Sequence, residues 1–256
     1  MIQLDSRDRT QITTELANFT GEKSTSPQTA TITSRVCHWL TPILYPLGRR
    51  VVLPSYFRHL KVTGQENIPR TGPIILAPTH RSRWDALLIP YAAGKPVTGR
   101  DLRFMVTEDE MKGIQGWFIR RLGGFPVNTR NPGVGSFRHS VELLRNGEAL
   151  VIFPEGDIYR EFQPLKPGIA RIALQVEASK PGLGLVIVPI GIRYSEPVPH
   201  WRCDATVTIG TPLKVANYCT RSTKKSAEYL TRDLEMTLRN LDEENVLADF
   251  LPVPTP

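Results

Sequence analysis

Short apolar runs recur along the middle of the chain, separated by turn signals and by segments of helical periodicity. Runs that are apolar at almost every position predict strands covered on both faces, as in parallel sheets with helices on either side. These runs are residues 74–77, 102–106, 150–153 and 185–190. A fifth segment, residues 205–209, alternates apolar with polar positions and predicts an edge strand.

Segments with apolar residues three or four positions apart lie between and after these runs and predict helices. They cover residues 86–89, 136–145, 169–177 and 226–241, and residues 116–122 predict a further amphipathic helix or turn. Strands that alternate with helices are typical of α/β proteins. We expect an α/β fold, a single domain with a central mixed, mostly parallel sheet flanked by helices.

The domain boundaries follow from composition. The chain has 256 residues, 40% of them hydrophobic, which is enough for one core of α/β size, and we place this domain at residues 60–245. Residues 1–33 are rich in Ser and Thr and lack the basic start and apolar core of a secretory signal, so we expect a disordered or loosely ordered lead-in. Residues 246–256, with a Pro-rich end, are expected to form a tail.

Residues 34–59, between the lead-in and the domain, are rich in large apolar side chains. Pro42, Pro46 and the pair Arg49-Arg50 interrupt this segment, which is too short to cross a bilayer, since that needs about 20 apolar residues. Aromatic rings near arginines, such as Trp39 here, are typical of helices that lie in a membrane interface. Two compatible interpretations remain: N-terminal interfacial helices, or a pair of short helices packed on the domain.

Charge and cysteine content narrow the possible partners. The chain carries 32 Lys and Arg against 25 Asp and Glu, a formal net charge of +7. This excess suits an anionic partner, which can be a membrane surface, a phosphorylated substrate or nucleic acid.

Cys37, Cys203 and Cys219 are scattered, which argues against a disulfide framework and against a zinc site, and we expect a reducing compartment.

The chemistry is expected where the first apolar run ends. Pro78 closes that run, so His80 should lie just beyond the carboxyl end of a strand, where open α/β sheets place their active sites. Ser82 is a suitable N-cap for the next helix, and Asp85 has the position whose side chain reaches back toward His80. A carboxylate on one imidazole nitrogen leaves the other nitrogen free as a base. The alternative is that Asp85 only caps the helix.

Four sequence blocks occur in the order found in a known family. The first runs from Val62-x-Gly64-x-Glu66-Asn67-Ile68-Pro69 through Gly72-Pro73 to the His80 block. The others are Gly123-Gly124-Phe125-Pro126-Val127-Asn128, Phe153-Pro154-Glu155-Gly156 and Val188-Pro189-Ile190-Gly191. Together, over about residues 60–213, they resemble the lysophospholipid acyltransferase family. The resemblance implies the glycerol-3-phosphate acyltransferase-like form of the α/β fold.

The resemblance also implies an activity. Members of this family move a fatty acyl group from acyl-CoA or acyl carrier protein to the free hydroxyl of a lysophospholipid, and the expected acceptor is 1-acyl-sn-glycerol-3-phosphate, giving phosphatidate in phospholipid biosynthesis. His80 would take the hydroxyl proton while Asp85 orients the imidazole. Glu155 and Gly156 would help form the acceptor site, and Pro189 would shape the acyl or acceptor pocket. We expect no metal and no cofactor.

The chain departs from the family pattern at two arginines associated with the substrate phosphate. Thr129 stands at the first position with Arg130 one residue later, and Ile158 stands at the second with Arg160 two residues later. We expect Arg130 and Arg160 to act as displaced phosphate contacts, because a guanidinium grips phosphate through two hydrogen bonds. The resembled family often has a lysine at the position of Lys166, which is either a third phosphate contact or a solvated surface residue. If these side chains point elsewhere, the acceptor is another lysolipid.

Other functional classes explain less of the sequence. The chain contains no G-x-S-x-G, G-x-x-x-x-G-K-[ST], G-x-G-x-x-G or H-E-x-x-H motif. A non-catalytic, peripheral membrane-binding protein on the same fold leaves His80 and Asp85 unexplained. A nucleic-acid-binding module would need exposed strands with aromatic and basic residues, so we expect no nucleic acid. The expected location is the cytoplasmic face of a membrane, with peripheral attachment to the lipid surface.

Overall fold

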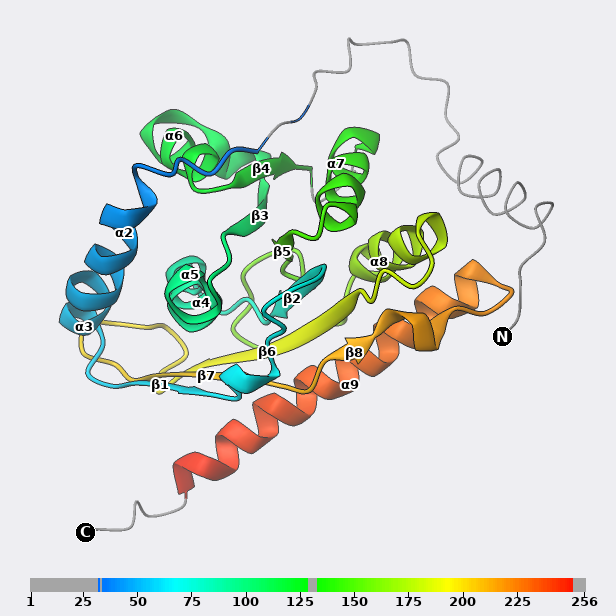
Figure 1. The fold of residues 1–256 in the computed structure, drawn as a ribbon. Coiled ribbons are helices and arrows are strands. Elements are labelled where there is room, and N and C mark those ends of the chain that lie inside the picture. Colours follow the sequence, from blue (N-terminus) through cyan, green and yellow to red (C-terminus); the bar gives the residue numbers. More distant parts are fainter. Residues whose placement is uncertain (1–31, 33, 129–132, 251–256) are drawn as a thin grey trace. The chain divides into compact units, whose positions relative to one another are not determined.

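One sheet runs through the part of the chain that the computed structural model describes, residues 32, 34–128 and 133–250. Figure 1 shows this sheet with helices on both sides. Its strands are β1 (Leu60–Thr63), β2 (Ile74–Pro78), β3 (Leu102–Thr107), β4 (Gly124–Val127), β5 (Ala149–Val151), β6 (Val186–Tyr194), β7 (Ala205–Ile209) and β8 (Leu213–Lys214).

Most neighbouring strands run parallel. The order across the sheet is β1-β7-β6-β2-β5-β3-β4, and β8 pairs with β6. The two antiparallel pairs among the described strands both involve β6, with β7 and with β8. The remaining pairs are parallel. The expected single α/β domain with a mixed, mostly parallel sheet is confirmed.

The helices follow the predicted segments closely. The α-helices are α2 (Thr41–Leu47), α3 (Leu53–Tyr56), α4 (Asp85–Ala93), α5 (Lys95–Thr98), α6 (Gly113–Arg121), α7 (Val134–Arg145), α8 (Gly168–Ser179) and α9 (Thr223–Phe250). A π-helix, η1 (Gly48–Val52), joins α2 to α3, and short 3₁₀ turns are η2 (Gln65–Asn67), η3 (Glu108–Met111) and η4 (Val215–Tyr218).

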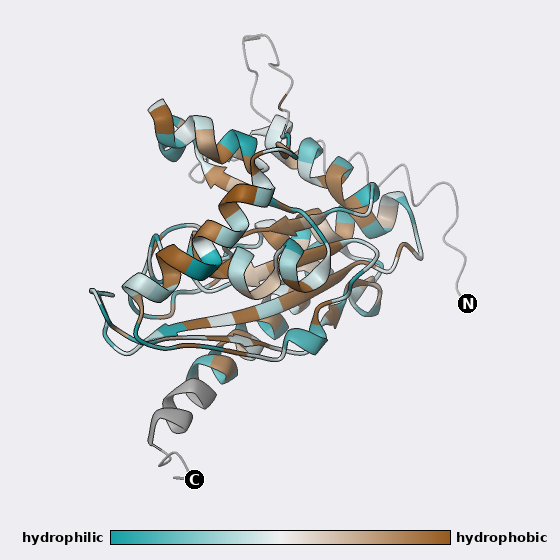
Figure 2. Ribbon diagram, turned by 60° about the vertical axis from the view of Figure 1, so that its left-hand side comes forward, coloured by the Kyte–Doolittle hydropathy of each residue, from teal (hydrophilic) through white to brown (hydrophobic). Residues whose placement is uncertain are grey.

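The sheet has a hydrophobic core on each face, and β2 at its centre contributes to both. Ile75 and Ala77 pack in the core formed with α7, α8 and α9. Ile74 and Leu76 pack in the other core, together with α3 and α4. Alternate residues of a strand point to opposite faces, so a strand covered on both sides is apolar throughout. Figure 2 shows hydrophobic residues concentrated along the strands of the sheet.

Three local predictions were wrong. Residues 205–209 do not form an edge strand, because β7 lies between β1 and β6 and the alternation reflects one covered face within the sheet. The strand β3 is only half-buried after Leu102, because its side chains line a pocket. Ser82 is not the N-cap: α4 begins at Asp85, with Trp84 before it.

The expected N-terminal helices form one helical segment, Thr41 to Tyr56. Its covered side includes Leu40 and Leu53, while Trp39 and Ile43 are exposed, so the segment packs on the domain and also presents an apolar face. No helix among the described residues is long and apolar enough to cross a membrane. Of the expected lead-in, residues 1–33, only Ile32 is described, and α9 continues to Phe250 into the expected tail.

Candidate active site

His80 and Asp85 meet across the turn between β2 and α4. The strand ends at Pro78, and Asp85 is the first residue of the helix. The imidazole Nδ1 lies 2.9 Å from the carboxylate oxygen Oδ2 of Asp85. A carboxylate at this nitrogen selects the tautomer with the proton on Nδ1 and leaves Nε2 free to accept a proton. The predicted reach of Asp85 back to His80 is therefore present in the structure.

Asp85 is fully buried and held by four donors. Its Oδ2 also accepts hydrogen bonds from the main-chain N–H groups of Arg81, at 2.6 Å, and Ser82, at 2.8 Å. Its other oxygen, Oδ1, accepts a hydrogen bond of 2.6 Å from the hydroxyl of Tyr194. Burial and the neighbouring carboxylate both raise the pKa of Tyr194, so this phenol stays protonated and remains a donor. Asp85 thus presents a fixed oxygen to His80.

His80 is held from a second side by an aromatic ring. Phe153, which follows β5, stacks on the imidazole with ring centroids 3.9 Å apart. The side chain of His80 keeps 17% of its surface exposed. That exposure gives substrate access to Nε2, while the stack and Asp85 restrict rotation of the ring.

A buried ion pair fixes the loops that carry these residues. Nη1 of Arg81 donates to both carboxylate oxygens of Glu155, at 2.9 and 2.8 Å. Both side chains lie in the interior, with 8% and 0% exposed. Burial raises the pKa of Glu155, and the nearby Arg81 guanidinium opposes that rise. The main-chain N–H of Tyr159 also donates to the carbonyl of His80, at 2.9 Å. Glu155 therefore braces the loop of His80 against the loop after β5.

Gly156 lies between the Arg81–Glu155 ion pair and Lys166. Its φ is +81°, which favours glycine, and a Cβ there would lie 2.5 Å from Nζ of Lys166. Gly156 also lines the pocket next to His80. The Lys166 ammonium is therefore close to the pocket, and among the described residues it makes no ion pair.

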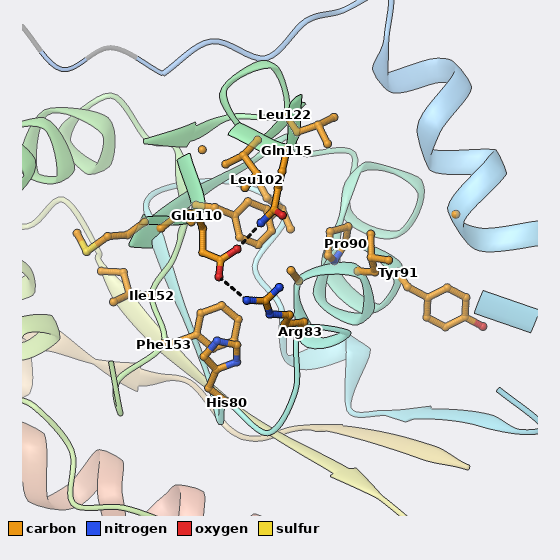
Figure 3. Close-up of a pocket in the computed structure, with 18 of the residues that line it drawn as sticks. His80, Arg83, Pro90, Tyr91, Leu102, Glu110, Gln115, Leu122, Ile152 and Phe153 are labelled. Carbon is orange, nitrogen blue, oxygen red and sulfur yellow. Dashed lines mark hydrogen bonds and ion pairs between the residues drawn. The ribbon is translucent and has the colours of Figure 1, made fainter. Parts of the chain in front are cut away.

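A cavity of about 600 Å³ opens from His80 toward the N-terminal helices. Figure 3 shows His80 and Phe153 at one side of it and Leu102 and Leu122 at another. Most of its lining is apolar, and these lining residues come from α2, α3, α4, β3, α6, β4 and the loop after β5: Leu44, Leu53, Leu87, Pro90, Phe104, Met105, Ile119, Val127, Ile152 and Ile158. The site therefore combines the His80–Asp85 pair with room for a long apolar group.

The other residues predicted for the site lie outside this cavity or outside the described part of the chain. Arg160 is exposed and does not line the cavity. Pro189 is buried within β6, in register with Ala77 of β2. Arg130 lies outside the described residues. Among those that are described, no three His, Cys, Asp or Glu side chains group as a metal site.

Sequence reasoning missed two residues that hold the dyad. Phe153 was named only as part of the third motif, with no role of its own, although an aromatic residue before Pro-Glu-Gly is a usable signal of a ring at the site. Tyr194 gave no signal, because it stands 109 positions from its partner Asp85.

The fold and the site define an α/β enzyme in which a histidine–aspartate pair lies beside a largely apolar pocket. The chain belongs to the acyltransferase family, since the family model of that description matches residues 59–193, more than half of the chain. The resemblance carried by the four motifs is thereby confirmed, and the protein is an O-acyltransferase.

Three known proteins are similar to this chain. A 1-acyl-sn-glycerol-3-phosphate acyltransferase of Bacillus subtilis is 27% identical over 191 residues, 72% of this chain and 89% of the relative. A protein of the same name from Streptococcus pneumoniae is 26% identical, over 67% of this chain and 61% of its own length. The crystal structure of the 1-acyl-sn-glycerophosphate (LPA) acyltransferase PlsC from Thermotoga maritima has a TM-score of 0.57 and 20% identity, and covers 80% of this chain and 81% of that one. This structural similarity supports the α/β fold described above.

Proposed function

We propose that the protein transfers a fatty acyl group from a thioester, acyl-CoA or acyl carrier protein, to the free hydroxyl of 1-acyl-sn-glycerol-3-phosphate, giving phosphatidate. The observation that carries this proposal is the His80–Asp85 pair opening into an apolar cavity of about 600 Å³. The names of the two curated relatives support the choice of acceptor.

The mechanism needs one base and no covalent enzyme intermediate. Nε2 of His80 takes the proton of the acceptor hydroxyl as its oxygen attacks the thioester carbonyl. The imidazolium is stabilised by Asp85, whose position is fixed by two main-chain N–H groups and Tyr194. The tetrahedral intermediate then collapses, the carbon–sulfur bond breaks, and the thiol leaves with the proton from His80. One ester forms for each thioester cleaved.

The cavity suits a fatty acyl chain. Each methylene group buried from water contributes about 0.8 kcal/mol, so an apolar cavity of this kind binds a long chain through area alone. Leu102 and Phe104 from β3 and Leu122 after α6 form part of its wall. The cavity begins at His80, which places the carboxyl end of the chain beside the base.

Cations near the mouth suit a phosphorylated acceptor. Lys166 lies beside Gly156 and has no ion-pair partner among the residues described, so it is open to an anion. Arg160 follows in the same loop as Gly156, and Arg130 belongs to the second motif. We assign all three as candidate phosphate contacts, each worth about 1.5–3 kcal/mol if it reaches a charged group.

The protein is expected to bind peripherally at the cytoplasmic face of a membrane. Ile43, Leu47 and Val51 recur every four residues, so they form a stripe along one helical face, which Trp39 extends from the turn before α2, and between 43% and 64% of each is exposed. On α6, Ile114 and Trp117 are also exposed, with Arg121 stacked 3.7 Å from the Trp117 ring centroid. Exposed aromatic and aliphatic side chains beside cations are typical of interfacial helices.

An acceptor screen tests the function. Purified protein is incubated with radiolabelled acyl-CoA or acyl carrier protein thioester and with 1-acyl-sn-glycerol-3-phosphate, lysophosphatidylcholine or lysophosphatidylethanolamine. We expect phosphatidate as the main product. Transfer to other lysolipids with none to the phosphate monoester supports the alternative acceptor that Thr129 and Ile158 suggest. No transfer from either donor to any acceptor supports the non-catalytic membrane-binding alternative.

A further inference from the structure

A polar cluster lines part of the mostly apolar cavity that begins at His80. Nη2 of Arg83 donates to Oε1 of Glu110 at 3.0 Å, and Nε2 of Gln115 donates to the other oxygen of Glu110. All three residues line the cavity. Figure 3 shows the Arg83 guanidinium between Glu110 and the rings of His80 and Phe153. The cluster joins the turn before α4 to η3 and α6.

The ion pair in this cluster is weak enough to exchange. The side chain of Arg83 is 76% exposed and that of Glu110 is 32% exposed, and solvent-exposed pairs contribute about 0–1 kcal/mol. A guanidinium has five N–H donors, and the hydrogen bond from Arg83 to Glu110 uses one of them. The remaining donors are available to an anion with paired oxygens, which a guanidinium binds with two parallel hydrogen bonds.

Among the described residues that line the cavity, the Lys and Arg side chains are Arg49 and Arg83. Arg49 is already engaged: its Nη1 donates to the carbonyl of Tyr91 at 2.9 Å, and its guanidinium lies 4.6 Å from the centroid of the Tyr91 ring. Arg83 follows His80 by three residues, at the turn that carries the base. It is the cation of the cavity that has both the position and the free donors.

The acceptor's own chemistry requires a cation at such a place. In 1-acyl-sn-glycerol-3-phosphate the free hydroxyl and the phosphate ester occupy neighbouring carbons. When His80 takes the hydroxyl proton, the phosphate therefore lies within a few bond lengths of the imidazole. A guanidinium at the same turn can reach it.

We infer that Arg83 is a specificity-determining residue that binds the phosphate monoester of the acceptor, an inference that rests on the function proposed above. Glu110 and Gln115 hold the guanidinium over the cavity before the acceptor binds. Glu110 also repels a phosphate whenever Arg83 is absent, because the carboxylate then faces the site without a counter-charge. With Arg83 present, the cluster attracts an anionic headgroup. Without Arg83, the cluster no longer favours an anionic headgroup.

The test measures kcat/KM with a fixed acyl thioester for two acceptors, 1-acyl-sn-glycerol-3-phosphate and 1-acylglycerol, which lacks the phosphate. Arg83→Ala should lower kcat/KM for the phosphorylated acceptor by about 10- to 100-fold, the size of a lost charge-assisted contact, mainly through KM. The value for 1-acylglycerol should stay near that of the wild type. Arg83→Lys should lose less, since it keeps the charge without the paired donors.

Two further variants keep the test decisive if Arg83→Ala folds poorly. Glu110→Gln should change the KM for the phosphorylated acceptor much less than Arg83→Ala does, because the amide oxygen can still accept a hydrogen bond from Arg83 while the repelling charge is removed. Arg83→Ala with Glu110→Gln should recover part of the loss, because the repelling carboxylate is gone. Arg145→Ala, at the exposed end of α7, makes the same change in net charge away from the cavity and serves as the control.

The outcomes separate this inference from the function on which it rests. Equal loss on both acceptors in Arg83→Ala, or a loss in Glu110→Gln that matches it, shows that the pair only holds the loop and overturns the role of Arg83. Wild-type protein that acylates other lysolipids and leaves the phosphate monoester unchanged overturns the acceptor itself. If the wild-type protein and Arg83→Ala acylate the phosphate monoester equally well, the proposed function stands and only the role of Arg83 is overturned.

Discussion

The hydroxyl of Tyr194 donates a hydrogen bond of 2.6 Å to Oδ1 of Asp85, the carboxylate that positions His80. This bond ties the end of β6 to the first residue of α4 through the interior of the protein. It occupies the carboxylate oxygen that does not face the imidazole, so Oδ2 remains directed at Nδ1.

Replacing Tyr194 with Phe should lower kcat while KM changes little, because the imidazole loses orientation and the substrate keeps its contacts. The free energy of unfolding should fall by about 1–3 kcal/mol, since Oδ1 of the buried Asp85 is left without a donor. Urea unfolding and steady-state kinetics measure the two effects. A wild-type kcat in a less stable Tyr194→Phe protein would show that the tyrosine has no part in positioning the dyad.

Removing the base or its partner should affect catalysis in different ways. His80→Ala should abolish transfer and leave the fold intact, because the partly exposed ring contributes little packing beyond its stack on Phe153. Asp85→Asn should lower kcat by roughly 10²- to 10⁴-fold, since the amide no longer fixes the imidazole tautomer. It should also lower the melting temperature, because Asp85 accepts hydrogen bonds from two main-chain N–H groups. Wild-type turnover in purified His80→Ala protein would refute the assigned base.

The sequence predicts well those features that depend on neighbouring residues. The run that became β2 is apolar at each position because both faces are covered, and the reach of Asp85 to His80 spans one turn. The prediction that β7 is an edge strand was wrong because it concerns residues that are distant in sequence. Alternation reports how many faces are covered, while strand order depends on partners distant in sequence, such as β1, which pairs with β7 in parallel.

The site also depends on contacts between residues that are distant in sequence, which local patterns do not predict. Arg81 and Glu155 stand 74 positions apart, and their burial decides whether the glutamate faces a substrate or pairs with an arginine. Nothing local distinguishes those roles. The cavity likewise depends on how the N-terminal helices, β3 and α6 come together, so the motifs predict its chemistry and leave its size and lining open.

Breaking the buried ion pair should destabilise the protein strongly. Glu155→Gln leaves the Arg81 guanidinium, 8% exposed, without a counter-charge, at a cost of about 3–5 kcal/mol. Arg81→Met combined with Glu155→Gln should recover part of that loss, because it removes the unpaired charge and also Nη2 of Arg81, a buried donor without a hydrogen-bond partner. Urea unfolding of the two single variants and the double variant gives the coupling free energy. Strictly additive losses would show that the two residues stabilise the loops independently.

Membrane binding should depend on the apolar stripe of the N-terminal helices. Ile43→Glu with Val51→Glu should reduce co-sedimentation with anionic phospholipid vesicles several-fold, because both side chains are exposed and the change replaces apolar contact with repulsion. Tyr229→Glu with Met236→Glu is the matched control, since these residues are 46% and 56% exposed on α9, which packs on the other face of the sheet. High salt should release part of the wild-type protein. Equal vesicle binding by the stripe variant and the control would exclude this face as the membrane contact.

The stability of the domain should depend on pH through His139. On α7, this imidazole bonds to the hydroxyl of Ser34 at 3.0 Å and meets the Phe125 ring edge-on. Burial lowers its pKa below the usual 6.5, with nearby Arg103 adding to the effect and Glu142 opposing it. Between the lowered pKa and 6.5 the unfolded chain binds more protons than the folded protein, so the free energy of unfolding falls as the pH falls.

We therefore expect His139→Gln to lose less stability than the wild type between pH 7.5 and pH 5.5, with a difference in slope below about 1.4 kcal/mol per pH unit, the limit for one proton. His200→Gln is the opposing control. Hydrogen bonds that His200 donates to the Trp201 carbonyl and to the Glu196 carboxylate raise the pKa of His200, so His200 contributes stability at low pH that is lost as the pH rises. Removing it should steepen the fall on acidification. Urea unfolding at a series of pH values measures all three slopes, and equal slopes for wild type and His139→Gln would show that this histidine titrates alike in the folded and unfolded chain.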